Sequence, residues 1–275
     1  MSYSNLHEAQ APFFVRYLSD LAAYRHLGAN LVASDLRARF RRSYLGILWA
    51  VLQPLGFALL IAYVWGTMFQ STSYWDYALY VFSGMIIWEY FATIVNVSQD
   101  ALTASEGYLK QTRIPFLIFQ VRVALTGLVI MVAGFVGLLC LMAALNRFPT
   151  FGGHLLLVPC YFVLILLFMS PLAVIMSILG TKLRDLKYIS MLAVQALFFV
   201  SPVMLGREIF ESDKMLLLNM LNPMTQLLQM FRAPLLYSSI WTVEQMLTIV
   251  IWVVALWLAA TWLSITEGRK LIFAL

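Results

Sequence analysis

Charged residues are scarce in this chain, and so are the residues that disulfide-linked proteins and most enzymes depend on. Only 11% of the 275 residues are charged, against about a quarter in an average soluble domain. The two cysteines, Cys140 and Cys160, both lie inside apolar runs, so no disulfide framework is indicated and we expect ordinary packing residues. A phosphate-binding GxxxxGK[ST] loop is absent as well.

Patterns for metal binding and catalysis are also missing. The three histidines, His7, His26 and His154, are scattered outside the apolar runs, and aspartates are never paired as DxD. No serine or cysteine nucleophile is accompanied by a base. We therefore expect no catalytic residue, no metal site and no cofactor in this chain. The absence of paired acids argues against a glycosyltransferase that holds a sugar nucleotide through a metal.

Apolar residues make up 62% of the chain, a composition typical of a polytopic membrane protein. A helix needs roughly 20 apolar residues to cross a bilayer. By that measure the sequence predicts an all-α membrane protein with six transmembrane helices, near residues 45–69, 77–98, 116–145, 155–180, 188–205 and 243–263. The first 35 residues are polar and resemble no cleavable signal peptide, so we expect the first span to target the chain.

The distribution of lysine and arginine predicts the orientation of these spans, because short cytoplasmic segments are enriched in both. With both termini inside, eleven such residues after position 35 fall on cytoplasmic segments and four on external ones. We therefore expect one transmembrane domain over residues 1–275. It would contain a cytoplasmic amphipathic interface region at 12–44, a six-span bundle at 45–263 and a cytoplasmic tail at 264–275.

A basic segment precedes the first predicted span. Apolar residues recur every four positions at Val32, Leu36, Phe40 and Tyr44, which predicts one apolar helical face. Asp35 and four arginines, namely Arg37, Arg39, Arg41 and Arg42, occupy the other faces. Such a helix lies at the membrane interface. It is either a simple positive flank or a docking helix for a cytoplasmic partner.

Two further polar segments interrupt the apolar runs. Residues 96–115 predict a short exposed cytoplasmic helix, capped by Ser98 or Asp100 and ended by Pro115, which is either a connector or a contact surface. Residues 206–235 predict two half-helices broken at Asn222-Pro223. A seventh span is the alternative there, but a central Arg232 would cost about 2.5–3.5 kcal/mol on insertion scales.

Ionisable and aromatic residues within the spans are candidates for a transport pathway. Glu89 could line a polar path, or it could pair with Arg122 and hold two helices together. Aromatic side chains near the second span are either an interfacial belt or contacts for sugar rings. These residues are Tyr74, Trp75, Tyr77, Tyr80, Trp88 and Tyr90.

The run DLRARFRRSYLGILWAVLQPL at 35–55 resembles the membrane subunits of polysaccharide ABC exporters, the ABC-2 type permeases. Their signature is a basic helix followed by Ser-x-Leu-Gly-x-x-Trp and Gln/Glu-Pro, which is matched here at Ser43, Leu45, Gly46, Trp49 and Gln53-Pro54. Weaker matches are Arg184-Asp185, Ser201-Pro202 and Asn222-Pro223. One departure is KQTRIP at 110–115, where the family more usually has Lys-x-x-x-Pro.

This resemblance implies a homodimer of six-span subunits in the bacterial inner membrane, paired with two copies of a separate ATPase that binds ATP and Mg²⁺. It implies export of a polyprenyl-linked polysaccharide such as O-antigen, capsule or teichoic acid. A small lipid or a drug as substrate, or a membrane-bound transferase, are the alternatives. The implied ATPase-docking residues are Arg37, Arg39, Arg41, Arg42, Tyr44, Asp100, Glu106 and Lys110. The half-helices, with Asn222, Pro223 and Arg232, would gate the outer end.

Overall fold

The computed structural model describes residues 19–20, 22–69, 73–107, 115–183, 185–205 and 222–274. Over these ranges the fold has eight α-helices, four short 3₁₀ turns and no strand. The α-helices are α3 (Arg25–Arg39), α4 (Trp49–Phe69), α5 (Tyr74–Val97), α7 (Leu117–Ala144), α8 (Leu157–Lys182), α9 (Leu186–Val200), α12 (Pro223–Leu236) and α13 (Val243–Ala274). The 3₁₀ turns are η1 (Gly46–Leu48), η2 (Ser98–Asp100), η3 (Thr103–Ser105) and η4 (Gly153–Leu156).

Among the described residues, five stretches are long and apolar enough to cross a membrane, and they coincide with five of the six predicted spans. They are Gly46–Trp65, Tyr74–Asp100, Leu117–Ala144, Gly153–Lys182 and Val243–Glu267. The helix of the last stretch, α13, continues to Ala274, well beyond the predicted end at residue 263. These five helices give the chain the build of a multi-pass membrane protein.

The remaining predicted span, 188–205, is shorter than expected. Its helix α9 has 15 residues, which corresponds to about 22 Å against a hydrocarbon core of about 30 Å. The helix stops at Val200 because Pro202 disfavours the helical conformation of the residue before it. Ser201 accordingly has extended backbone angles, φ −105° and ψ 147°. Residues 201–205 therefore continue from α9 as non-helical chain.

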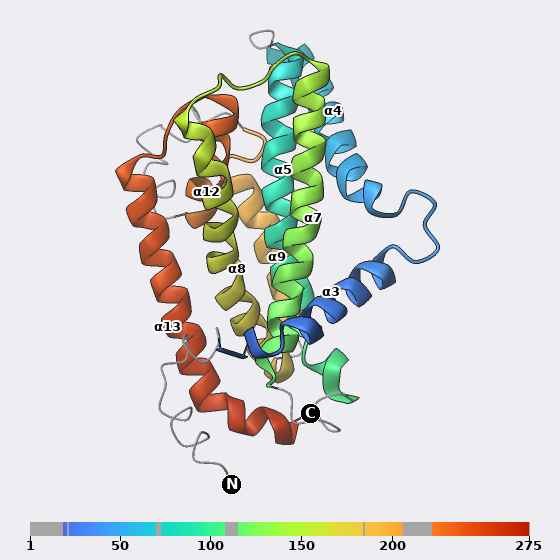
Figure 1. The fold of residues 1–275 in the computed structure, drawn as a ribbon, viewed down its shortest axis with the longest axis vertical. Helices are drawn as coiled ribbons and strands as arrows, with labels where there is room; N and C mark the ends of the chain where they lie inside the picture. The colour runs from blue at the N-terminus through green and yellow to red at the C-terminus, as the bar shows by residue number, and fades with distance from the viewer. Residues whose placement is uncertain are drawn as a thin grey trace.

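Helix α5 lies at the centre of the bundle and packs on α4, α7, α8, α9 and α12. Glycines on α7 permit its close approach, because a Cβ at Gly127 would meet the ring of Tyr90 and one at Gly134 would meet Ile86. At the periphery, α4 and α13 leave most of their apolar side chains uncovered within this chain. Figure 1 shows α3 across the start of α7 at one end of the bundle, and α12 beside α8 toward the other. We call these the α3 end and the α12 end.

The basic helix differs from its predicted form. It ends at Arg39, so the predicted apolar face that includes Phe40 and Tyr44 is wrong, and Tyr44 is fully exposed. The chain turns instead, with positive φ angles at Arg42 (65°) and Gly46 (51°). The side of α3 that is covered lies one to two turns earlier and packs on the start of α7, through Tyr24, Leu27, Gly28, Leu31, Ile118 and Phe119.

The segment after α5 is also more buried than predicted. In place of one exposed helix, η2 and η3 form two 3₁₀ turns, and the side chains of Ser98, Gln99, Leu102 and Ser105 are buried. The turns lie against the end of α8 at Gly180, where a Cβ would overlap the backbone of Gln99. A glycine at this position is therefore what allows the two segments to touch. The rest of the predicted helix, at 108–114, lies outside the described residues.

Candidate functional site

The turn before α4 explains why the motif Ser-x-x-Gly precedes the first span. The Ser43 hydroxyl accepts a hydrogen bond from the Gly46 N–H at 3.2 Å. Gly46 occupies the left-handed region, which costs a glycine little. Together they redirect the chain from α3 into α4, and the four arginines Arg37, Arg39, Arg41 and Arg42 remain exposed beside this turn.

A partly buried ion pair fixes α3 to the bundle. The Arg122 Nε atom lies 3.4 Å from Asp35 Oδ2, and the two side chains are 14% and 32% exposed. Arg122 also stands over the ring of Phe119, 5.8 Å from its centroid. In the described part of the chain, Arg122 therefore pairs with Asp35 on α3 and not with Glu89. Of the two roles weighed for Glu89, the ion pair with Arg122 is absent here.

Glu89 lies instead in a small cleft of about 40 Å³ between α4, α5 and α7. The cleft brings a predicted docking residue, Arg39, together with predicted pathway residues Glu89 and Tyr90. Motif residues line it as well, namely Trp49, Gln53 and Pro54. The signature of the first span therefore shapes both the turn at the α3 end and the wall of a polar cleft.

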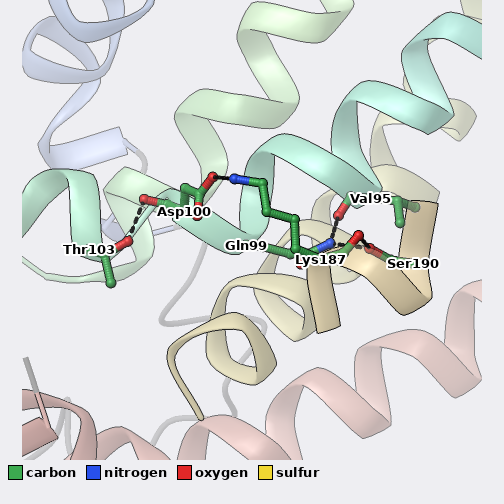
Figure 2. Close-up of polar contacts among 6 residues, drawn as sticks. All are labelled: Val95, Gln99, Asp100, Thr103, Lys187 and Ser190. Atoms are coloured by element: carbon green, nitrogen blue, oxygen red, sulfur yellow. Dashed lines mark hydrogen bonds and ion pairs between the residues drawn. The ribbon is translucent and has the colours of Figure 1, made fainter. Parts of the chain in front are cut away.

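Two of the other docking candidates, Asp100 and Glu106, lie at the same end. Asp100 is exposed and forms an ion pair with Lys187 at 2.8 Å, which joins η2 to the start of α9 (Figure 2). Glu106 is partly exposed in the segment after η3. Lys110 lies outside the described residues. A second ion pair at this end joins Lys182 of α8 to Glu267 of α13, so the α3 end is rich in charge.

The aromatic candidates on α5 fall into three groups, of which the third, Tyr77 and Tyr80, contacts the segment after α9. Tyr74 and Trp75 meet edge to face near the start of α5, with Trp75 exposed. Trp88 and Tyr90 are buried, with exposures of 5% and 3%. Trp88 packs on Phe91 and Phe198, and the Tyr90 hydroxyl donates to the Ala124 carbonyl at 2.9 Å. Within one chain these two side chains join helices together. A role in contacting substrate stays a prediction for all of them.

Tyr77 and Tyr80 hold the non-helical segment that follows α9. The Tyr77 hydroxyl donates to the Met204 carbonyl at 2.8 Å. The Tyr80 hydroxyl donates to the carbonyls of Pro202 and Leu205, at 3.1 and 2.9 Å. Non-helical backbone at membrane depth requires such partners, because lipid offers none.

Arg232 of α12 completes this arrangement. Its side chain is 1% exposed and donates to the Ser83 hydroxyl (3.1 Å) and to the carbonyls of Pro202 (2.6 Å), Tyr80 (2.9 Å) and Val203 (3.0 Å). The guanidinium lies 3.6 Å from the centroid of the Tyr80 ring, close enough for a cation–π contact. We name this cluster, made of Arg232, Tyr80, Ser83 and residues 201–205, the arginine cluster.

The predicted break at Asn222-Pro223 is the start of α12. Pro223 occupies the first turn, and the Asn222 side chain accepts a hydrogen bond from the Met224 N–H at 3.0 Å as a helix cap. Asn222 also donates to the Ser201 hydroxyl at 2.9 Å, next to the arginine cluster. The first predicted half-helix, at 206–221, lies outside the described residues.

Sequence reasoning missed several residues that make these contacts. Gly84 is one, because a Cβ there would meet the guanidinium of Arg232 and the Val203 carbonyl. Gln99, Ser190 and Lys187, which join η2 to α9, are others. A glutamine and a serine at the ends of apolar helices are the only signal that the sequence offers for them. The described residues contain no group of three or more His, Cys, Asp or Glu side chains that could hold a metal ion.

Comparison with known proteins fits this architecture. Residues 29–236 match the family of ABC-2 type transporters. The chain is 29% identical over 262 residues to the O-antigen export system permease protein RfbA of Myxococcus xanthus, an alignment that covers 94% of this chain and 98% of that protein. It is 23% identical over 175 residues to the polysialic acid transport protein KpsM of Escherichia coli, covering 63% of this chain and 67% of that protein. The chain belongs to the ABC-2 type transporter family, as a multi-pass permease subunit whose nucleotide-binding ATPase is a separate polypeptide.

Proposed function

We propose that this permease exports a lipid-linked polysaccharide, most specifically an O-antigen, across the bacterial inner membrane. The observation that supports this most strongly is the alignment with an O-antigen export permease over nearly the full length of both chains. The second relative is named for transport of polysialic acid, which is also a glycan polymer.

In this proposal the permease is a homodimer of six-span subunits with two ATPase copies, and both termini are cytoplasmic. The excess of basic residues at the α3 end supports this orientation, because lysine and arginine mark cytoplasmic segments. The sixth crossing consists of α9 together with residues 201–205. Its short helix is compatible with a crossing because the arginine cluster satisfies the carbonyls of the non-helical part.

The ATPase docks at the α3 end, on the exposed arginines and the segment after α5. ATP binding by the partner displaces these elements and opens a path for the glycan. The cleft that contains Glu89 supplies polar groups to that path, and weak binding at many sites lets a polymer slide. The segment that begins at Asn222 and includes Arg232 gates the opposite end.

Neutralising Arg41 and Arg42 together, as Arg41→Gln with Arg42→Gln, tests the docking assignment. Both side chains are exposed, so the change leaves the fold intact and weakens copurification with the ATPase. Arg147→Gln is the control, because it removes a positive charge from an exposed position after α7, at the opposite end of the bundle. Unchanged copurification and ATP turnover in the Arg41/Arg42 variant would exclude docking at this turn.

The substrate class requires its own experiment. The permease and its ATPase, reconstituted in proteoliposomes, should move a polyprenyl-linked glycan when ATP is present. Movement of a small lipid or a drug, with no response to the glycan, would replace the polysaccharide assignment and leave the family assignment in place.

A further inference from the structure

Helix α9 is held at its two ends and lightly packed in between. Of its 15 residues, only Ser190 and Val194 are buried. Most of its remaining apolar side chains are exposed within this chain, among them Tyr188, Ile189, Leu192, Leu197 and Phe199. Within one chain, α9 therefore has a narrow buried face, and the contacts at its two ends are the main ones that couple it to other elements of the same chain.

At the α3 end, two successive residues of η2 contact the first turns of α9 (Figure 2). The Gln99 amide donates to the Val95 carbonyl at 2.7 Å and to the Ser190 hydroxyl at 2.6 Å, and both bonds are buried. The Asp100 carboxylate accepts a hydrogen bond from the Lys187 ammonium at 2.8 Å. Residues three apart lie on the same face of a helix, so Lys187 and Ser190 present one face of α9 to η2.

The two contacts differ in strength. Gln99 is 3% exposed, and a buried donor that loses its partner cannot replace it with water. The side chains of Asp100 and Lys187 are 59% and 54% exposed, and an ion pair in contact with water is weak. Gln99 therefore provides the stronger contact between η2 and α9. The Asp100–Lys187 ion pair adds a weaker contact that changes how strongly a displacement of η2 also displaces α9.

At the α12 end, α9 continues directly into residues 201–205, which belong to the arginine cluster. Their carbonyls accept hydrogen bonds from Tyr77, Tyr80 and Arg232. The Ser201 hydroxyl accepts from Asn222, the residue that caps α12. Any axial shift or rotation of α9 therefore acts directly on the segment that positions α12.

We propose that α9 is a strut that transmits displacement of η2 to residues 201–205 and α12. Gln99, Asp100 and Lys187 are the positioning residues that couple η2 to it. The inference rests on the proposed function only in taking the ATPase to act at the α3 end. The inference adds a physical route from the ATPase to the α12 end. A displacement of η2 at the α3 end passes through α9 to residues 201–205 and α12.

A thiol-labelling experiment tests this route. Cys140 and Cys160 are first replaced by alanine, and Met204→Cys is introduced as a partly buried reporter in the segment after α9. The complex of permease and ATPase is labelled with a water-soluble maleimide in two states. In one state no nucleotide is present, and in the other the ATPase is held with ATP bound. The labelling rate should differ between the two states when α9 and η2 are intact.

Reversing the charges of Asp100 and Lys187 then tests whether their ion pair couples η2 to α9. Asp100→Lys and Lys187→Asp should each reduce the nucleotide-dependent difference in labelling about two- to five-fold, the factor expected from an exposed ion pair. The double variant, which restores opposite charges, should recover it. Lys182→Asp makes the same charge change at the same end in a pair that does not involve α9, and should leave the difference unchanged.

If the ion pair only stabilised the fold, the single variants would lower the thermal stability and leave the nucleotide-dependent labelling difference unchanged. Thermal stability should stay near the parent value in all variants, because the altered side chains are substantially exposed. ATPase copurification should stay near the parent value in Lys187→Asp and Lys182→Asp, whose residues are outside the predicted docking set, so a loss of coupling in Lys187→Asp does not come from lost docking. If the single variants label as the parent does, or if the double variant fails to recover the difference, the strut is excluded while the proposed function stands. If the parent permease binds no ATPase at all, the proposed function fails and the strut fails with it.

Discussion

Replacing Arg232 with methionine removes the donor group that ties α12 to α5 and to residues 201–205. Four hydrogen bonds are lost, one to the Ser83 hydroxyl and three to backbone carbonyls. At a net of about 0.5–1.5 kcal/mol each, the loss amounts to roughly 2–6 kcal/mol. Methionine avoids the cost of burying a charge, which offsets part of it. We expect a net destabilisation of about 2–4 kcal/mol.

Thermal unfolding in detergent measures this change. For a chain of this size, about 2–4 °C of midpoint shift accompanies each kcal/mol, so the midpoint should fall by roughly 5–15 °C. Arg147→Met is the matched control, because Arg147 is 49% exposed and pairs with Asp76, and such pairs contribute at most about 1 kcal/mol. Equal shifts for the two variants would refute the account of the arginine cluster.

Two further substitutions probe contacts at the α3 end. Gly180→Ala should destabilise the fold by about 1–3 kcal/mol, because the added Cβ overlaps the backbone of Gln99. Gly56→Ala on α4 meets no atom within 4 Å and should be neutral or slightly stabilising in the same thermal assay. Asp35→Asn should loosen α3 from the bundle by weakening its ion pair with Arg122. Faster proteolysis between α3 and α4, with an unchanged unfolding midpoint, is the expected result, and unaltered cleavage would argue against it.

Length and apolar composition alone predicted most of the bundle. Five of the six predicted spans correspond to long apolar helices, because a bilayer requires an uninterrupted apolar run and leaves few alternatives. The Ser-x-Leu-Gly-x-x-Trp motif predicted the family, and the structure explains Ser43 and Gly46 as parts of one turn. The break at Asn222-Pro223 was also visible, since proline and a capping asparagine together start a helix.

What the sequence left open depends on contacts between residues far apart in the chain. Arg232 is a costly residue in any apolar window, and only the fold reveals that carbonyls of residues 80, 202 and 203 surround it. Glu89 was the one acidic partner that the sequence suggested for Arg122, and the packing of α3 on α7 places Asp35 beside Arg122 instead. The end of α3 at Arg39 was missed because apolar residues continue to recur every four positions through Tyr44. The chain nevertheless turns after Arg39, with positive φ angles at Arg42 and Gly46.

The most direct test of the central claim is ATP-dependent movement of a polyprenyl-linked glycan in proteoliposomes that contain this permease and the ATPase from its own cells. We expect movement only when both proteins and hydrolysable ATP are present, with ATP turnover that rises when the glycan is added. Glycan movement by this chain alone, or movement that persists without ATP, would contradict it.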